Sequence, residues 1–148
     1  MRIAIGSDHA GFELKMELIR SLEGRGVAVD DLGTRSLEST DYPTYGHAVA
    51  EAVAHGRAEL GVLVCGSGNG VNITANKHHG VRSALAWLPE VAALARQHND
   101  ANVLALPARF VTISEGIDIL GAFLEARFEG GRHARRVAAI EPLEQAAS

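Results

Sequence analysis

A short apolar run followed at once by a glycine-rich loop constrains this chain more than any other feature. Leu60–Val64 has no polar side chain, which predicts a strand buried on both faces. Gly66–Gly70 has three glycines in five residues, and Val71–Lys77 then has helical spacing. A buried strand that leads through such a loop into a helix gathers free backbone N–H groups, which attract negative charge.

Cys65, the only cysteine of the chain, stands where this predicted strand ends. A thiol beside a helix N-terminus ionises readily and can serve as a base or a nucleophile. An isolated cysteine can equally be a small buried apolar residue. The loop is not a dinucleotide-binding fingerprint, because Val71 stands where the last glycine is required, and it is not a P-loop, because no Gly-Lys-Ser/Thr follows.

Short apolar segments alternate with helical periodicity along the whole chain, which predicts a three-layer α/β domain around a parallel sheet. The segment 30–45, with its glycine, proline and Ser/Thr residues, is expected to be irregular. The last helix is expected over about 133–147, with a possible break near Pro142. The other expected elements are strands at 3–5, 27–29, 60–64, 81–87 and 103–106, and helices at 12–22, 46–55, 71–77, 89–97 and from Thr112 or Ser114 to about 127.

Length and composition exclude several classes of protein. The 148 residues suit a single domain over 1–148, and a net charge of −4 gives no reason to expect nucleic acid as a partner. No apolar run is long enough to span a bilayer, so no membrane association is expected. One cysteine excludes an internal disulfide, and the chain opens directly into a predicted strand rather than a signal peptide. Both facts favour the cytoplasm.

Three polar segments follow predicted strands and are expected to converge, because ligands of parallel sheets bind beyond the carboxyl ends of the strands. Asp8 and His9 follow the first strand, the Cys65 loop follows the third, and Arg109 follows the fifth. Asp8 could be part of a functional pair with His9, or it could simply cap the next helix.

Two further clusters lie outside the predicted strand ends. His98 follows a helix, where a histidine can be a general acid or base, or a cap that the helix dipole stabilises. Arg132 and Arg136 share a helix face and could bind a phosphate, or form a solvated basic helix end. No cluster has the ligand spacing of a structural zinc site, and no metal is expected. This set suits proton abstraction next to the carbonyl of a phosphorylated sugar, or acyl chemistry at Cys65.

Six motifs, spread over nearly the whole chain, resemble the type B ribose-5-phosphate isomerase family, which includes galactose-6-phosphate and allose-6-phosphate isomerases. They are Gly6-Ser-Asp-His-Ala-Gly-Phe-Glu-Leu-Lys15, Asp41-Tyr-Pro43, Cys65-Gly-Ser-Gly-Asn-Gly70, Ala75-Asn-Lys77, Arg96-Gln-His-Asn-Asp-Ala-Asn-Val103 and Glu129-Gly-Gly-Arg-His133. The resemblance implies a Rossmann-like α/β/α sandwich with a five-stranded parallel sheet. It also implies a homodimer, or a dimer of dimers, with active sites at the subunit interface.

The resemblance further implies aldose–ketose isomerisation through a cis-enediolate, with no metal or coenzyme. Cys65 resembles the base that moves the proton between C2 and C1, Ser67 the hydroxyl that shuttles a proton between O1 and O2, and His98 the group that opens the furanose ring. The residues that resemble substrate-binding groups are Asp8 and Asn99 for sugar oxygens, Tyr42 at the wall of the site, the amides of Gly66, Gly68, Asn69 and Gly70 for the anion, and His9, Arg109, Arg132 and Arg136 for the phosphate.

The expected reaction is therefore the interconversion of ribose 5-phosphate and ribulose 5-phosphate, a step of the pentose phosphate pathway. A rival is the same chemistry on allose 6-phosphate or galactose 6-phosphate, because the distance between Cys65 and the phosphate site sets the substrate length and a sequence gives no such distance. A rival of another class is a non-catalytic sugar-phosphate-binding protein, against which Cys65, Ser67 and His98 argue.

Overall fold

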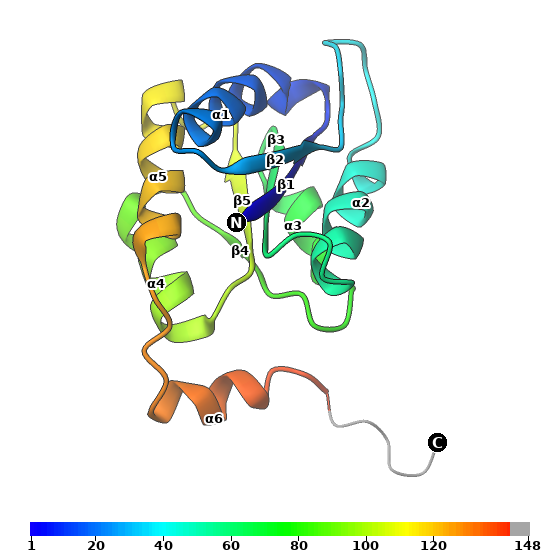
Figure 1. The fold of residues 1–148 in the computed structure, drawn as a ribbon. Coiled ribbons are helices and arrows are strands. Elements are labelled where there is room, and N and C mark those ends of the chain that lie inside the picture. The colour runs from blue at the N-terminus through cyan, green and yellow to red at the C-terminus, as the bar shows by residue number, and fades with distance from the viewer. Residues whose placement is uncertain (143–148) are drawn as a thin grey trace.

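Five parallel strands form one sheet in the order β2-β1-β3-β5-β4 (Figure 1). The computed structural model describes residues 1–142. The predicted three-layer fold with a five-stranded parallel sheet is confirmed. The strands are β1 (Arg2–Ser7), β2 (Ala28–Asp31), β3 (Leu60–Cys65), β4 (Ser83–Leu85) and β5 (Val103–Pro107).

Helices cover both faces of the sheet and bury two separate apolar layers. One layer packs α1, α4 and α5 against the strands, and the other packs α2 and α3. A short helix, α6, lies outside these layers and contacts the end of α4 (Figure 1). The elements are the 3₁₀ turn η1 (His9–Gly11) and the helices α1 (Phe12–Gly24), α2 (Tyr42–Ala54), α3 (Asn69–Ala75), α4 (Pro89–Asn99), α5 (Ile113–Glu125) and α6 (Arg132–Ala138).

The central strand β3 is buried along its whole length, as its continuous apolar sequence predicts. Its residues alternate between the two layers: Val62 and Val64 join the α1 side, whereas Leu63 and Cys65 join the α2 and α3 side. Gly61 has no side chain because α2 packs directly on it, and a Cβ there would lie 2.6 Å from Val49. Cys65 therefore ends β3 facing α2 and α3.

Three elements differ from the sequence-based expectation. Helix α2 begins at Tyr42 rather than Gly46, because Pro43 occupies the first turn, where a missing N–H costs nothing. Strand β4 has only three residues, because it lies at the sheet edge and pairs with β5 alone. Helix α6 ends at Ala138, and the part of the expected helix beyond residue 142 lies outside the described residues. None of the helices within residues 1–142 is long and apolar enough to cross a bilayer.

Candidate active site

A cavity of about 330 Å³ opens at the carboxyl edge of the sheet, between the ends of β1 and β3. The chain winds from β1 to β2 on one side and returns to β3 on the other, so the cavity lies at the topological switch point, where open α/β sheets bind their ligands. The predicted convergence of three polar segments is therefore observed. The lining residues are Asp8, His9, Ala10, Tyr42, Cys65, Gly66, Ser67, Gly70 and Arg109.

Cys65 is 4% exposed, and it belongs both to the apolar layer of α2 and α3 and to the lining of this cavity. The loop that follows it is held by main-chain hydrogen bonds from the segment after β5. The Ala108 N–H donates to the Cys65 carbonyl at 2.9 Å, and the Arg109 N–H donates to the Gly66 carbonyl at 3.0 Å. These bonds bring Arg109 next to Gly66, although the two residues are distant in the sequence.

The glycines of the loop leave its backbone bare where it meets the cavity. Gly68 has a φ of +77°, and a Cβ there would lie 2.5 Å from Leu85. A Cβ at Gly70 would lie 2.5 Å from the Tyr42 ring. The Ser67 hydroxyl accepts a hydrogen bond from the Asn69 N–H at 3.2 Å. Because α3 begins here, the amides of its first turn have no intrahelical acceptor, and those beyond Asn69 can donate to an anionic ligand.

Asp8 and His9 are both fixed by hydrogen bonds at the cavity wall. The Asp8 carboxylate accepts from the Gly11 N–H at 3.2 Å, so it caps η1 as one interpretation of the sequence predicted, and it also lines the cavity. His9 Nδ1 accepts from the Thr40 N–H at 3.1 Å, and the His9 N–H donates to the Thr40 hydroxyl at 3.1 Å. Because Nδ1 is an acceptor, the His9 proton resides on Nε2, which can donate to a ligand.

Arg109 lies against the bare backbone of Gly66. A Cβ at Gly66 would lie 3.1 Å from the Arg109 guanidinium carbon, so a larger residue there would displace this side chain by a few tenths of an ångström. Arg109 is far from Asp8 and His9 in the sequence, yet all three residues line the same cavity. It supplies a positive charge that can bind a phosphate.

Three other predicted site residues, His98, Asn99 and Arg136, line a second cavity of about 270 Å³ between the end of α4 and α6, and Arg132 is not part of its lining. Arg132 begins α6, and Arg136 follows one turn later. Val137 and Ile140 form an apolar wall of this cavity, and the sequence analysis assigns no role to either residue. The lining residues are His98, Asn99, His133, Arg136, Val137 and Ile140.

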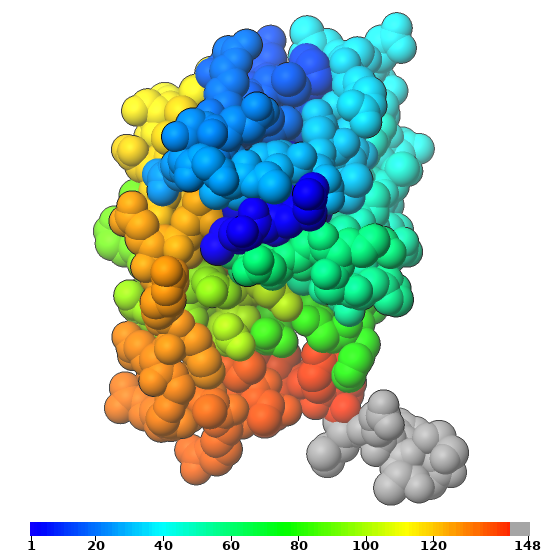
Figure 2. Space-filling view, in the orientation of Figure 1, coloured from blue at the N-terminus to red at the C-terminus, as the bar shows by residue number. Residues whose placement is uncertain are grey.

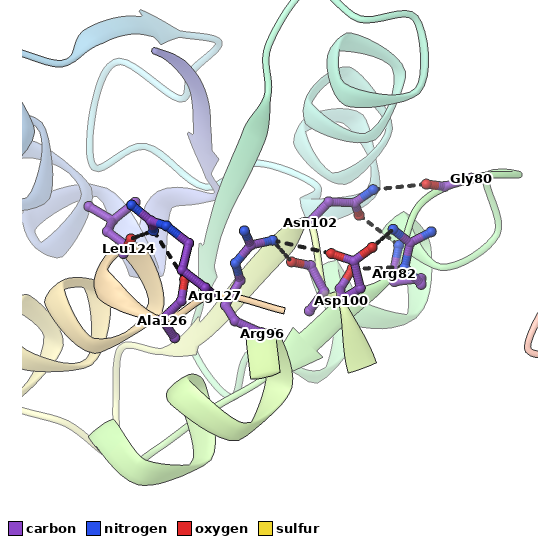
Figure 3. A network of polar contacts seen from close by, with 9 residues as sticks. Gly80, Arg82, Arg96, Asp100, Asn102, Leu124, Ala126 and Arg127 are labelled. Atoms are coloured by element: carbon purple, nitrogen blue, oxygen red, sulfur yellow. Dashed lines mark hydrogen bonds and ion pairs between the residues drawn. The ribbon is translucent and has the colours of Figure 1, made fainter. Parts of the chain in front are cut away.

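A network of polar contacts fixes the turn that follows His98 and Asn99 (Figure 3). Asp100 ends α4 in the left-handed conformation, with φ of 47°. Its carboxylate accepts from Arg82 Nη2 at 3.3 Å and lies 3.8 Å from Arg96 Nη1. Arg82 Nε donates to the Asp100 carbonyl at 2.8 Å. This network ties the end of α4, which carries His98 and Asn99, to the start of β4.

Two histidines and a glutamate meet beside this cavity. The rings of His98 and His133 stack with centroids 4.2 Å apart and planes 10° apart. Glu129 Oε1 lies 3.6 Å from Nε2 of both rings. Burial, together with the charges of His98, Arg132 and Arg136, lowers the pKa of His133, while Glu129 opposes the shift. The sequence marks Glu129 and His133 as part of a family motif but assigns neither of them a role in the site.

The two cavities lie at opposite edges of the sheet. Cys65 pairs with Pro107 at the end of β5, whereas His98 and Asn99 precede the start of β5. The length of β5, about 13 Å, therefore separates the level of Cys65 from the level of His98 and Asn99 along the strand direction. In Figures 1 and 2, α6 lies at the lower end of the molecule, whereas the turn from β1 into α1 lies at the upper end. One copy of the chain thus does not bring His98, Asn99, Arg132 and Arg136 to Cys65.

A doubly wound α/β domain with a polar cavity at the switch point defines a class of proteins that bind small ligands at the carboxyl edge of a parallel sheet. Comparison with known proteins identifies the member of this class. The model of the ribose/galactose isomerase family matches residues 3–140, and the chain belongs to this family. The resemblance seen in the sequence is confirmed.

Individual relatives agree with this assignment. Ribose-5-phosphate isomerase B of Escherichia coli is 50% identical over 144 residues, which cover 97% of each chain. The structure of Clostridium thermocellum ribose-5-phosphate isomerase B is 47% identical, with a TM-score of 0.96 and full coverage of both chains. The Mycoplasma genitalium enzyme with bound ribulose-5-phosphate is also 47% identical, with a TM-score of 0.91 over 94% of this chain and 93% of that one.

Proposed function

We propose that this chain interconverts D-ribose 5-phosphate and D-ribulose 5-phosphate through a cis-enediolate, with no metal or coenzyme. The observation that carries the proposal is the position of Cys65, which lines a polar cavity together with bare loop backbone and Arg109. The names of the relatives, one of which holds ribulose-5-phosphate, support this substrate. The single free thiol favours the reducing cytoplasm as the location of the reaction.

The proposed chemistry uses each group of the first cavity once. Cys65, as thiolate, removes the proton from C2 of the open-chain aldose and returns it to C1. Ser67 moves the hydroxyl proton between O2 and O1. The amides of the loop from Gly66 to Gly70 stabilise the enediolate oxygens, where negative charge develops. Asp8 binds sugar hydroxyls, Tyr42 closes the wall, and His9 and Arg109 bind the phosphate.

We infer that a second copy of the chain completes this site, in a homodimer or a dimer of two such dimers. The second copy would bring its His98 and Asn99 to the sugar ring, and its Arg132 and Arg136 to the phosphate. Support comes from the opposite placement of the two cavities within one chain. Large apolar side chains also remain exposed around the elements of the carboxyl edge, namely Tyr42 (42%), Ile73 (60%), Trp87 (52%) and Phe110 (74%).

A mixture of two inactive variants tests this shared site. Cys65→Ala and His98→Asn are each expected to be nearly inactive with ribose 5-phosphate. In a mixed dimer, one site loses both groups and the other site loses neither. Equal amounts, unfolded and refolded together, should therefore recover about a quarter of the wild-type activity, because half of the dimers are mixed. A mixture that stays inactive, although mass spectrometry detects mixed dimers, would show that both groups act within one chain.

Substrate length is tested by comparing kcat/KM for ribose 5-phosphate and allose 6-phosphate. A site built for five carbons should prefer ribose 5-phosphate by about 10- to 200-fold, the discrimination that one misplaced carbon unit usually gives. A preference for allose 6-phosphate would assign the six-carbon reaction instead. Binding of both compounds without turnover of either would favour a non-catalytic sugar-phosphate-binding protein.

A further inference from the structure

Glu129 is held between the two stacked histidines by its own backbone. Its N–H donates to the carbonyl of Gln97 at 3.0 Å, which ties it to the residue before His98. The His133 N–H donates to the Gly130 carbonyl at 3.0 Å, which begins α6 one turn later. These main-chain bonds place Glu129 so that Oε1 of its half-exposed carboxylate lies 3.6 Å from Nε2 of both rings.

The geometry of the cluster favours an electrostatic role of the carboxylate over metal binding. Donor atoms of His98, Glu129 and His133 all lie within 4.8 Å of one another, which is close enough to consider an ion. A metal ion, however, lies near the plane of each imidazole ring at about 2.0–2.1 Å from its nitrogen. Two nearly parallel rings stacked 4.2 Å apart do not share such a point. At 3.6 Å the Glu129 oxygen is beyond hydrogen-bond distance, but its negative charge still favours the tautomer of His98 that carries its proton on Nε2.

We propose that Glu129 is a positioning residue for His98, holding the proton on Nε2 so that Nδ1 faces the sugar as the base for ring opening. This inference rests on the proposed function, in which His98 opens the furanose. His133 supports the arrangement as a neutral ring, because its lowered pKa keeps it uncharged near neutral pH. It can then stack on His98 without repelling the positive charge that His98 gains during the reaction.

The step assigned to this unit is balanced within the substrate. Nδ1 of His98 takes the proton from the C1 hydroxyl, the C1=O1 bond forms, and the bond between C1 and the ring oxygen O4 breaks. The same proton is then delivered to O4. During the transfer His98 is an imidazolium whose Nε2–H faces the Glu129 carboxylate, which stabilises the charge as an acidic partner does for other catalytic histidines.

The test measures the rate and the deuterium isotope effect of Glu129→Gln with ribose 5-phosphate deuterated at C2, with Glu125→Gln as the control. Ribose 5-phosphate is mostly a closed ring and must be opened before its C2–H bond breaks. Glutamine retains an acceptor but not the charge. We expect kcat/KM with ribose 5-phosphate to fall by about tenfold or more. The isotope effect on kcat/KM should shrink towards 1, because ring opening, which does not break the C2–H bond, then limits the rate.

The equilibrium constant fixes the ratio of kcat/KM in the two directions, so the value measured with ribulose 5-phosphate should fall by the same factor. His98→Asn should show the same suppressed isotope effect, and Glu125→Gln, which changes an exposed glutamate at the end of α5, should behave as wild type. A slower Glu129→Gln whose isotope effect is no smaller than that of wild type would overturn the positioning role while leaving the isomerase intact. A wild-type protein without isomerase activity would instead overturn the proposed function.

Discussion

Replacing Cys65 by alanine is expected to slow isomerisation by about 10²–10⁴-fold, the contribution of a general base, in both directions of the reaction. The reason is that the neighbouring groups are already engaged. Asp8 caps η1, and His9 Nδ1 accepts from Thr40, so neither is free to replace the thiolate at C2. Rates with ribose 5-phosphate and with ribulose 5-phosphate measure the effect.

Binding should survive this substitution, because the loop amides, His9 and Arg109 are unchanged. The affinity for the acid analogue 5-phosphoribonate, measured by calorimetry, is expected to stay within about threefold of wild type, since the lost group acts on the reacting proton rather than on the phosphate. Val62→Ala is the matched control, because it shortens a buried residue on the opposite face of β3. Near-normal turnover of Cys65→Ala would refute the thiol as the base.

Replacing Asp31 by asparagine is expected to destabilise the fold by about 3–5 kcal/mol. Lys15 is fully buried, and its Nζ lies 2.6 Å from Asp31 Oδ1. Without the carboxylate, the ammonium group would remain in the interior without a countercharge. Asp31 also accepts from the Gly33 N–H at 3.0 Å, and the Gly33 carbonyl accepts from the Ser7 N–H at 2.6 Å. These two hydrogen bonds connect Asp31 to Ser7, which precedes Asp8 of the first cavity.

Denaturant unfolding at a fixed protein concentration measures this effect. The adjacent Asp30→Asn is the control, because Asp30 pairs with Arg2 at the surface and such pairs contribute about 0–1 kcal/mol. The double variant Lys15→Met/Asp31→Asn should recover most of the lost stability, since it removes both charges. A destabilisation of Asp31→Asn no larger than that of Asp30→Asn would show that Lys15 does not depend on this partner.

The elements of the fold were largely readable from local patterns. Continuous apolar runs indicated the strands, and helical periodicity with flanking glycines indicated the helices, because both signals depend on neighbours in the chain. The sequence pattern does not predict the start of α2 at Tyr42. Pro43 is a common signal for a loop, but a proline also fits the first turn of a helix. The placement of β5 between β3 and β4 was not predicted, because strand order depends on long-range pairing.

Local sequence patterns likewise predicted one part of the candidate site and not the other. The Cys65 loop was recognisable because strand, glycines and helix follow one another within a few residues. Its convergence with Asp8 and Arg109 followed from the rule that parallel strands end at one edge. Glu129 was missed as a partner of His98, because the two are 31 residues apart and only the packing of α6 against α4 brings them together.

The order of apolar, glycine and polar residues along the chain was therefore enough to specify a parallel α/β domain with a reactive thiol at the end of its central strand, since backbone preference and burial act over short distances. Only the tertiary structure decided that the thiol and His98 stand at opposite edges of the sheet. That separation arises because α4 runs antiparallel to the strands and ends beside the start of β5, a relation that no local pattern encodes.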